Sequence, residues 1–139
     1  MTTIHLVVTA YLVGLIWLIQ LIHYPAFRWV AADRWADFHH AHTAAMGLLA
    51  GGPMIIALLI GCWLSWQAGL TWTGENLRQH LALACELLAW AVTFLISVPL
   101  HTKLAGGPDP AAINLLILSN WARTAAWTAK LAILLYPAR

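Results

Sequence analysis

Long apolar stretches separated by short polar segments are the dominant feature of this chain. They cover residues 4–23, 39–66, 77–100 and 110–136. Each is close to or longer than the roughly 20 residues that a helix needs to cross the hydrocarbon core of a bilayer. The sequence shows no run in which apolar and polar residues alternate, as they would in a barrel strand. The pattern therefore predicts an all-α fold, an integral membrane antiparallel bundle of four transmembrane helices.

Proline and glycine mark the expected boundaries of these helices. Pro25 should close the first helix, because proline disfavours helical geometry in the residue before it. Gly51-Gly52-Pro53 should kink the second helix or let a neighbour approach closely. Gly106-Gly107-Pro108 predicts a tight turn, and Asp109-Pro110 predicts a helix start with an acidic N-cap. Residues 28–37 are expected to form a loop or an interfacial helix, and residues 1–139 a single domain.

Composition points to the same class of protein. Of the 139 residues, 62% are hydrophobic and 9% are charged, and the mean hydropathy is +0.76. These values lie far outside the range of soluble domains, so we expect a multi-pass protein of a bacterial inner (cytoplasmic) membrane. The net charge of +2 is spread thinly, which excludes a nucleic-acid partner. Basic residues are divided evenly between the two sides, and we place both termini in the cytoplasm.

Four histidines are expected at one membrane level. In an alternating topology, the end of the first helix, the start of the second and the end of the third lie on one side. This side then carries His23, His39, His42 and His101. His39 and His42 stand three residues apart on one helical face, so both can converge on one ligand. A histidine-rich helix start can also simply lie among lipid headgroups.

This cluster has the composition of a metal site in a bundle core. Neutral imidazoles bind iron, copper or zinc, and the expected cofactor is iron or copper, with zinc less favoured. Asp37 and Tyr24 are the nearby groups that would accept the second ring N–H of a ligating histidine. The alternatives are hydrogen-bonded structural histidines without metal, or axial ligation of a haem b. His5 and His80 fall at the opposite side and are expected at the interface.

A second polar group lies in the fourth helix. Asn120, Arg123, Thr124 and Trp127 share one helical face. An arginine deep in a span needs an anion, and Glu86 is the one acid within any predicted span, so the two are expected to pair across neighbouring helices. Alternatively, Arg123 and Asn120 hold an oxygen atom of a substrate. Lys130 is expected to extend to the interface.

Four short motifs carry a family resemblance. They are His23-Tyr24-Pro25, Phe38-His39-x-x-His42, Val98-Pro99-Leu100-His101 and Asn120-Trp121-x-Arg123-Thr124. With these motifs the chain resembles a family of small bacterial four-helix membrane proteins of unassigned function. It is more distantly similar to the anthrone oxygenase-like group, whose named members oxidise aromatic polyketides. Trp121, within the last motif, is a candidate cofactor-binding residue together with Tyr24 and Asp37.

Three functional hypotheses follow. The leading one is a small membrane oxidoreductase in which a histidine-bound metal acts on a lipophilic substrate positioned by the catalytic candidates Asn120 and Arg123. The second is an electron-transfer protein that binds b-type haem or a quinone. The third is a non-catalytic accessory subunit of a larger membrane complex or a homo-oligomer. In that hypothesis the small residues Ala44, Gly47 and Gly51 would support close helix contact.

Overall fold

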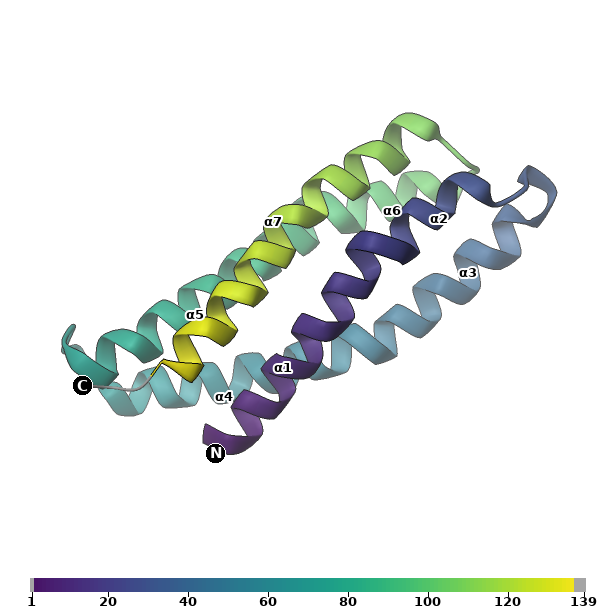
Figure 1. The fold of residues 1–139 in the computed structure, drawn as a ribbon. Coiled ribbons are helices and arrows are strands. Elements are labelled where there is room, and N and C mark those ends of the chain that lie inside the picture. Colours follow the sequence, from purple (N-terminus) through teal and green to yellow (C-terminus); the bar gives the residue numbers. More distant parts are fainter. Residues whose placement is uncertain (1, 137–139) are drawn as a thin grey trace.

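The computed structural model describes residues 2–136, which form helices joined by short turns (Figure 1). No β-strand occurs in this range. The α-helices are α1 (Thr2–Leu18), α2 (Tyr24–Ala26), α3 (Trp35–Met46), α4 (Gly52–Ala68), α5 (Gly74–Val92), α6 (Val98–Leu104) and α7 (Pro110–Leu135). The all-helical prediction is therefore confirmed.

These elements line up as four rods. The rods are α1 with α2, α3 with α4, α5 with α6, and α7 alone, and they lie side by side (Figure 1). Helix α7 packs along α5 and α1, and α4 packs against both α5 and α1. The start of α1 and the end of α7 lie at one end of the bundle, and α2, α3 and α6 lie at the other. This second end holds the predicted histidine cluster.

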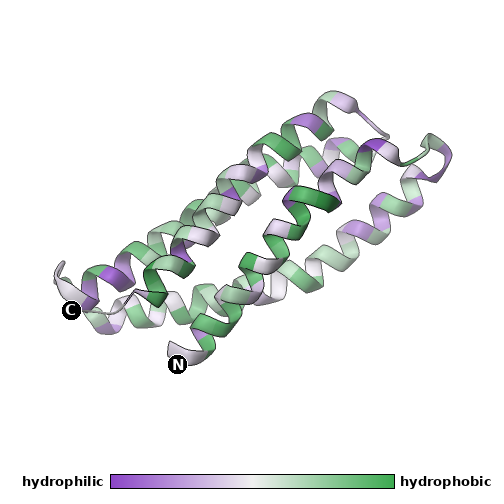
Figure 2. Cartoon of the chain, viewed as in Figure 1, coloured by the Kyte–Doolittle hydropathy of each residue, from purple (hydrophilic) through white to green (hydrophobic). Residues whose placement is uncertain are grey.

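Three of the rods are long and apolar enough to cross a membrane. They cover Thr2–Trp29, Ala32–Ala68 and Gly74–Leu104. Helix α7 is the fourth rod, and its polar residues Asn120, Arg123 and Lys130 are all buried. The polar side of α7 therefore faces the other helices. Figure 2 shows most hydrophilic residues toward the two ends of the bundle.

The outer surface of the bundle is rich in large apolar side chains. Exposed examples are Ile22, Leu48, Leu59, Leu95 and Leu118. Charged Glu86, Arg123 and Lys130 are instead buried. A soluble domain has the opposite distribution, because lysine, glutamate and arginine are almost never fully buried there. The distribution seen here is typical of a helical bundle in lipid, where charged side chains turn to the interior.

Three prolines lie inside the rods. Pro25, Pro53 and Pro99 each stand in the first turn of a new α-helix, two residues after a π-helical turn. The π-helical turns are η1 (Ile19–His23), η4 (Gly47–Gly51) and η5 (Thr93–Ser97). Proline lacks a backbone N–H, and the wider turn before it shifts the hydrogen-bond pattern so that the helix continues. The prediction that Pro25 closes the first helix is therefore wrong, since helical structure continues to Trp29.

The other boundaries also differ from the sequence expectation. Residues 28–37 contain the 3₁₀ turns η2 (Phe27–Trp29) and η3 (Ala32–Arg34), after which α3 begins. Trp35, the first residue of α3, is buried, and its Nε1 donates a hydrogen bond to the Leu104 carbonyl at 2.7 Å. The third rod extends from Gly74 to Leu104 and is longer than residues 77–100. These extensions bring α3 and α6 into contact at the histidine end.

The start of α7 is as predicted. The Asp109 side chain accepts hydrogen bonds from the backbone N–H groups of Ala111 at 2.9 Å and Ala112 at 3.1 Å. Pro110 occupies the first helical position. Before it, Gly107 adopts a φ of 144°, a conformation that glycine tolerates, in the turn that joins α6 to α7. Lys103 Nζ lies 2.5 Å from Asp109 Oδ2 across this turn.

Lowering the pH should weaken the N-cap that Asp109 provides for α7. The Lys103 ammonium and the N–H groups of Ala112 and Ala111 hold the pKa of Asp109 below its ordinary value of 3.8. Because the folded-state pKa is the lower one, the stabilisation is present above pH 3.8 and is lost as the pH falls through the folded-state pKa. Asp109→Asn keeps a capping oxygen but cannot titrate. Between about pH 5 and about pH 2, the Tm in detergent should fall further for the wild type than for Asp109→Asn. Parallel curves would contradict this prediction.

Candidate functional site

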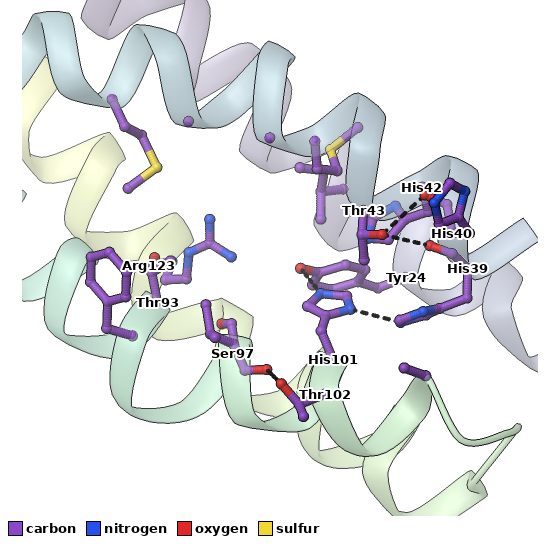
Figure 3. Close-up of a pocket in the computed structure, with 18 of the residues that line it drawn as sticks. Tyr24, His39, His40, His42, Thr43, Thr93, Ser97, His101, Thr102 and Arg123 are labelled. Carbon is purple, nitrogen blue, oxygen red and sulfur yellow. Dashed lines mark hydrogen bonds between the residues drawn. The ribbon is translucent and has the colours of Figure 1, made fainter.

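A pocket of about 760 Å³ lies between the second and third rods at the histidine end (Figure 3). One wall comes from α3, η4 and the start of α4, and the other from the end of α5, η5 and α6. Much of the lining is apolar and includes Met46, Met54, Trp90, Phe94 and Val98. Its polar groups include His39, His42, His101, Tyr24 and Arg123. The pocket thus has a largely apolar lining, with the histidines and Tyr24 at one end and Arg123 farther from them (Figure 3).

The structure brings the four predicted histidines together. His23 Nε2 and His42 Nδ1 are 2.7 Å apart, and His39 Nε2 and His101 Nδ1 are 3.3 Å apart. The His42 and His101 ring centroids are separated by 5.0 Å. Tyr24, which is buried, contacts His101 Nε2 through its hydroxyl at 3.2 Å. Three helical rods therefore contribute to one cluster of imidazoles.

Aromatic side chains hold these imidazoles in place. Trp35 stacks on His39 with ring centroids 5.8 Å apart, and Phe27 meets His42 edge-on at 5.0 Å. Both aromatic residues are buried. A neutral imidazole has one donor and one acceptor nitrogen, so the pairs form hydrogen bonds when one ring donates to the other. Tyr24, His101 and His39 then form a chain of hydrogen-bonding groups at the pocket.

The geometry does not form a ready metal centre. Among residues 2–136, no group of three or more His, Cys, Asp or Glu side chains is arranged to hold a metal ion. Asp37, the predicted carboxylate partner, is exposed and does not line the pocket. Trp121 is 44% exposed and lies edge-on to Trp17 at 5.7 Å, also away from the pocket. Of the three predicted cofactor-binding residues, only Tyr24 reaches the cluster.

Arg123 is a buried cation in the pocket wall. It is 5% exposed, and its Nη1 donates to Asn120 Oδ1 at 3.2 Å. Asn120 in turn donates through Nδ2 to Gln20 Oε1 at 2.8 Å. Arg123 Nε has no hydrogen-bond partner within the described part of the chain. A buried guanidinium whose N–H donors are not all used favours a neighbouring group with oxygen atoms that accept hydrogen bonds.

The predicted pair of Glu86 and Arg123 is wrong. Glu86 instead accepts a hydrogen bond from Lys130 Nζ at 2.6 Å, and both side chains are 0% exposed. Lys130 therefore does not extend to the interface. The sequence predicts that the third helix ends at Leu100, but this helix continues to Leu104. This extra turn moves Glu86 away from the expected level of Arg123 and toward that of Lys130.

The two remaining predicted histidines differ from each other. His5 is 1% exposed, so the prediction of an interfacial side chain is wrong for it. Its ring lies beside Gly61 of α4, where a Cβ would be 3.6 Å from His5 Nε2, an ordinary contact distance. His80 is partly exposed on α5, beside the turn that follows α4. It contacts Ser65 Oγ at 2.6 Å and the Gly69 carbonyl at 3.0 Å.

Sequence reasoning missed several residues that line the pocket. Thr93 and Ser97 lie on the third rod, and with His101 they follow an i, i+4, i+8 spacing that could have identified them. Gly47 and Gly51 also line the pocket. A Cβ at either glycine would meet nothing within 4 Å, so no neighbouring helix packs closely against either position within the bundle. All three π-helical turns contribute to the lining, in keeping with the frequency of such turns at functional sites.

Comparison with protein-family models, with curated proteins and with solved structures finds no match for this chain. The family resemblance stays a prediction from the motifs. The functional argument therefore depends on the geometry of the pocket.

Proposed function

We propose that this chain is a membrane protein whose four rods span the bilayer as an antiparallel bundle and whose pocket binds a lipophilic small molecule. The observation that carries the proposal is the pocket of about 760 Å³ with a largely apolar lining and a few hydrogen-bonding side chains. Ligand sites in proteins are commonly of this size and composition. The apolar outer surface of the bundle supports the membrane location. A bacterial cytoplasmic membrane stays the predicted location.

The polar groups favour a ligand with oxygen atoms in its head group. Arg123 offers donors only, while His101 and the Tyr24 hydroxyl can donate or accept. A quinone or a related oxygenated aromatic molecule presents such acceptors on a flat ring. Trp90 and Phe94, which stack on each other at 5.3 Å, suit the apolar parts of that ligand. Tyr24 and His101 can supply or remove a proton at the ligand oxygen.

Titration calorimetry with a short-chain quinone tests this proposal. The wild-type protein in detergent should bind one quinone with saturation. Arg123→Met removes a charged donor worth about 1.5–3 kcal/mol and should weaken binding by about 10-fold to 100-fold. Trp121→Phe, on the outer surface, is the matched control and should leave the Kd unchanged. The absence of saturable binding in the wild type, or equal weakening in the control, would contradict the proposal.

A bound iron or copper ion is the second candidate, and one distance favours it. The 3.3 Å between His39 Nε2 and His101 Nδ1 is close to the ~3.3 Å that separates two ligand nitrogens on a tetrahedral metal with bonds of about 2.0–2.1 Å. His42, paired with His23, lies beside these rings and would supply a further nitrogen after ring rotation. Such a metal would supply redox chemistry, and the protein would then be an oxidoreductase acting on the lipophilic ligand.

Elemental analysis of protein purified without a histidine tag separates the two candidates. With the metal candidate, iron or copper is present near one equivalent and is lost in His42→Ala and His101→Ala. A Soret band in the visible spectrum would instead indicate haem b. If the purified protein contains no metal but still binds quinone, the metal hypothesis is wrong and the ligand-binding proposal is retained.

A further inference from the structure

A second cluster of buried polar side chains lies in the opposite half of the bundle. At its centre is the ion pair between Lys130 and Glu86, both fully buried. His5 and Thr9, one turn apart on α1, are also buried. Several atoms here have no hydrogen-bond partner among the described residues, namely Glu86 Oε1, both ring nitrogens of His5 and the Thr9 hydroxyl. Buried polar atoms are nearly always paired, so this concentration calls for an explanation.

Glu86 and His5 both lie beside Gly61 of α4. A Cβ at Gly61 would lie 3.0 Å from Glu86 Oε2 and 3.6 Å from His5 Nε2, so the carboxylate and the imidazole approach the same point of α4. His5 also lines a smaller cavity of about 160 Å³ at the end of the bundle where α1 begins. The other residues of this cavity include Thr2, Thr3, Arg78 and Gln79. His5 therefore connects a polar cavity at the bundle end with the buried ion pair.

We infer that His5, Glu86 and Lys130 form a buried proton-exchange site that is loaded through this end cavity. A proton that enters the cavity passes to a ring nitrogen of His5 and then to the Glu86 carboxylate, whose Oε1 is free to accept it. Histidine suits this transfer because one ring nitrogen can accept a proton while the other ring nitrogen gives one up. Paired ionisable groups inside a membrane bundle commonly mark proton pathways. The site is separate from the histidine pocket and does not depend on its ligand.

The charges around Glu86 favour a proton over a metal cation. Lys130 faces it from α7 and His5 from α1, while α4 contributes only the uncharged Gly61 at the contact. Cys85, the neighbour of Glu86 on α5, is a free thiol. A metal cation beside Oε1 would be repelled by the Lys130 ammonium, which lies 2.6 Å from the other carboxylate oxygen. A proton instead neutralises the carboxylate and leaves a single positive charge on Lys130.

Infrared difference spectroscopy of the protein in lipid tests the site. Glu75 and Glu86 are the only glutamates in the chain, so the variant Glu75→Gln labelled with ¹³C-glutamate reports on Glu86 alone and leaves Glu86 intact. Lowering the pH from about 8 to about 4, into the ordinary range of carboxylate titration, should produce the C=O band of a protonated carboxyl group. The band should carry the isotope shift and should move again in D₂O. If no isotope-shifted carboxyl band appeared at any pH in this range, the proposed proton-exchange site would be wrong.

The route through His5 is tested by the rate of exchange. In the labelled protein, deuterium should reach Glu86 within the mixing time. His5→Phe should slow that exchange to a rate that the spectrometer resolves. His80→Phe is the matched control, since His80 does not line the end cavity, and should leave the exchange fast. Equal exchange in the two histidine variants would overturn the route.

Discussion

Replacing Glu86 by glutamine or Lys130 by methionine alone should destabilise the fold by about 3–5 kcal/mol, whereas the double replacement should cost far less. Each single change leaves the other charge buried without a partner, because both side chains are 0% exposed. The double change removes both charges together. The measurement is the free energy of unfolding in mixed micelles for the two single variants and the double variant.

An ion pair nearer the surface provides the control for this experiment. Glu75 and Arg78 lie 2.5 Å apart on α5, and both are partly exposed. Glu75→Gln should cost no more than about 1 kcal/mol, as is usual for exposed pairs. If the single changes at Glu86 and Lys130 were as mild as this control, the two side chains would not form a buried pair. The packing of α5 against α7 described above would then be wrong.

Gly51→Leu should abolish binding to the pocket without destabilising the fold. Gly51 lines the pocket, has helical backbone angles, and would meet nothing within 4 Å if it carried a Cβ. Leucine is favoured over glycine within a helix by roughly 0.5–1 kcal/mol. The added side chain therefore enters the space that the ligand would use. Quinone titration and thermal unfolding in the same detergent measure both effects.

The matched control for this prediction is Gly14→Leu. Gly14 lies on α1, also meets nothing within 4 Å of a Cβ, and does not line the pocket. The Gly14→Leu variant should leave both quinone binding and the stability of the fold nearly unchanged. Full binding in Gly51→Leu would show that the ligand lies elsewhere, and lost binding in both variants would show that binding is not specific to the pocket.

The overall fold followed from hydropathy because a bilayer-spanning length of apolar residues has few alternatives to a helix. The boundaries were harder to predict. Pro25 was expected to end a helix, but η1 (Ile19–His23) precedes it and the helix continues. A π-helical turn depends on neighbouring helices as well as on local sequence. Local rules for proline therefore could not place the end of this rod.

The candidate site was predictable in part. Alternating helix directions were sufficient to group His39, His42 and His101, since depth in a bundle depends mainly on distance from a helix end. The partner of Glu86 was missed because one extra turn of the third rod changes which residue of α7 lies opposite. His5 was misplaced for a different reason. Its side chain lies against α4 beside Gly61, and no pattern in the sequence near His5 indicates that contact.

Photo-crosslinking with a short-chain azidoquinone is the most direct test of ligand binding in the pocket. After illumination in lipid, mass spectrometry of peptides locates the modified residues. Modification should concentrate on residues that line the pocket, such as Met46, Met54 and Phe94, and should be suppressed by unlabelled quinone and by Gly51→Leu. Modification spread over exposed outer residues such as Leu21 and Leu118, with no competition, would contradict a ligand site between the second and third rods.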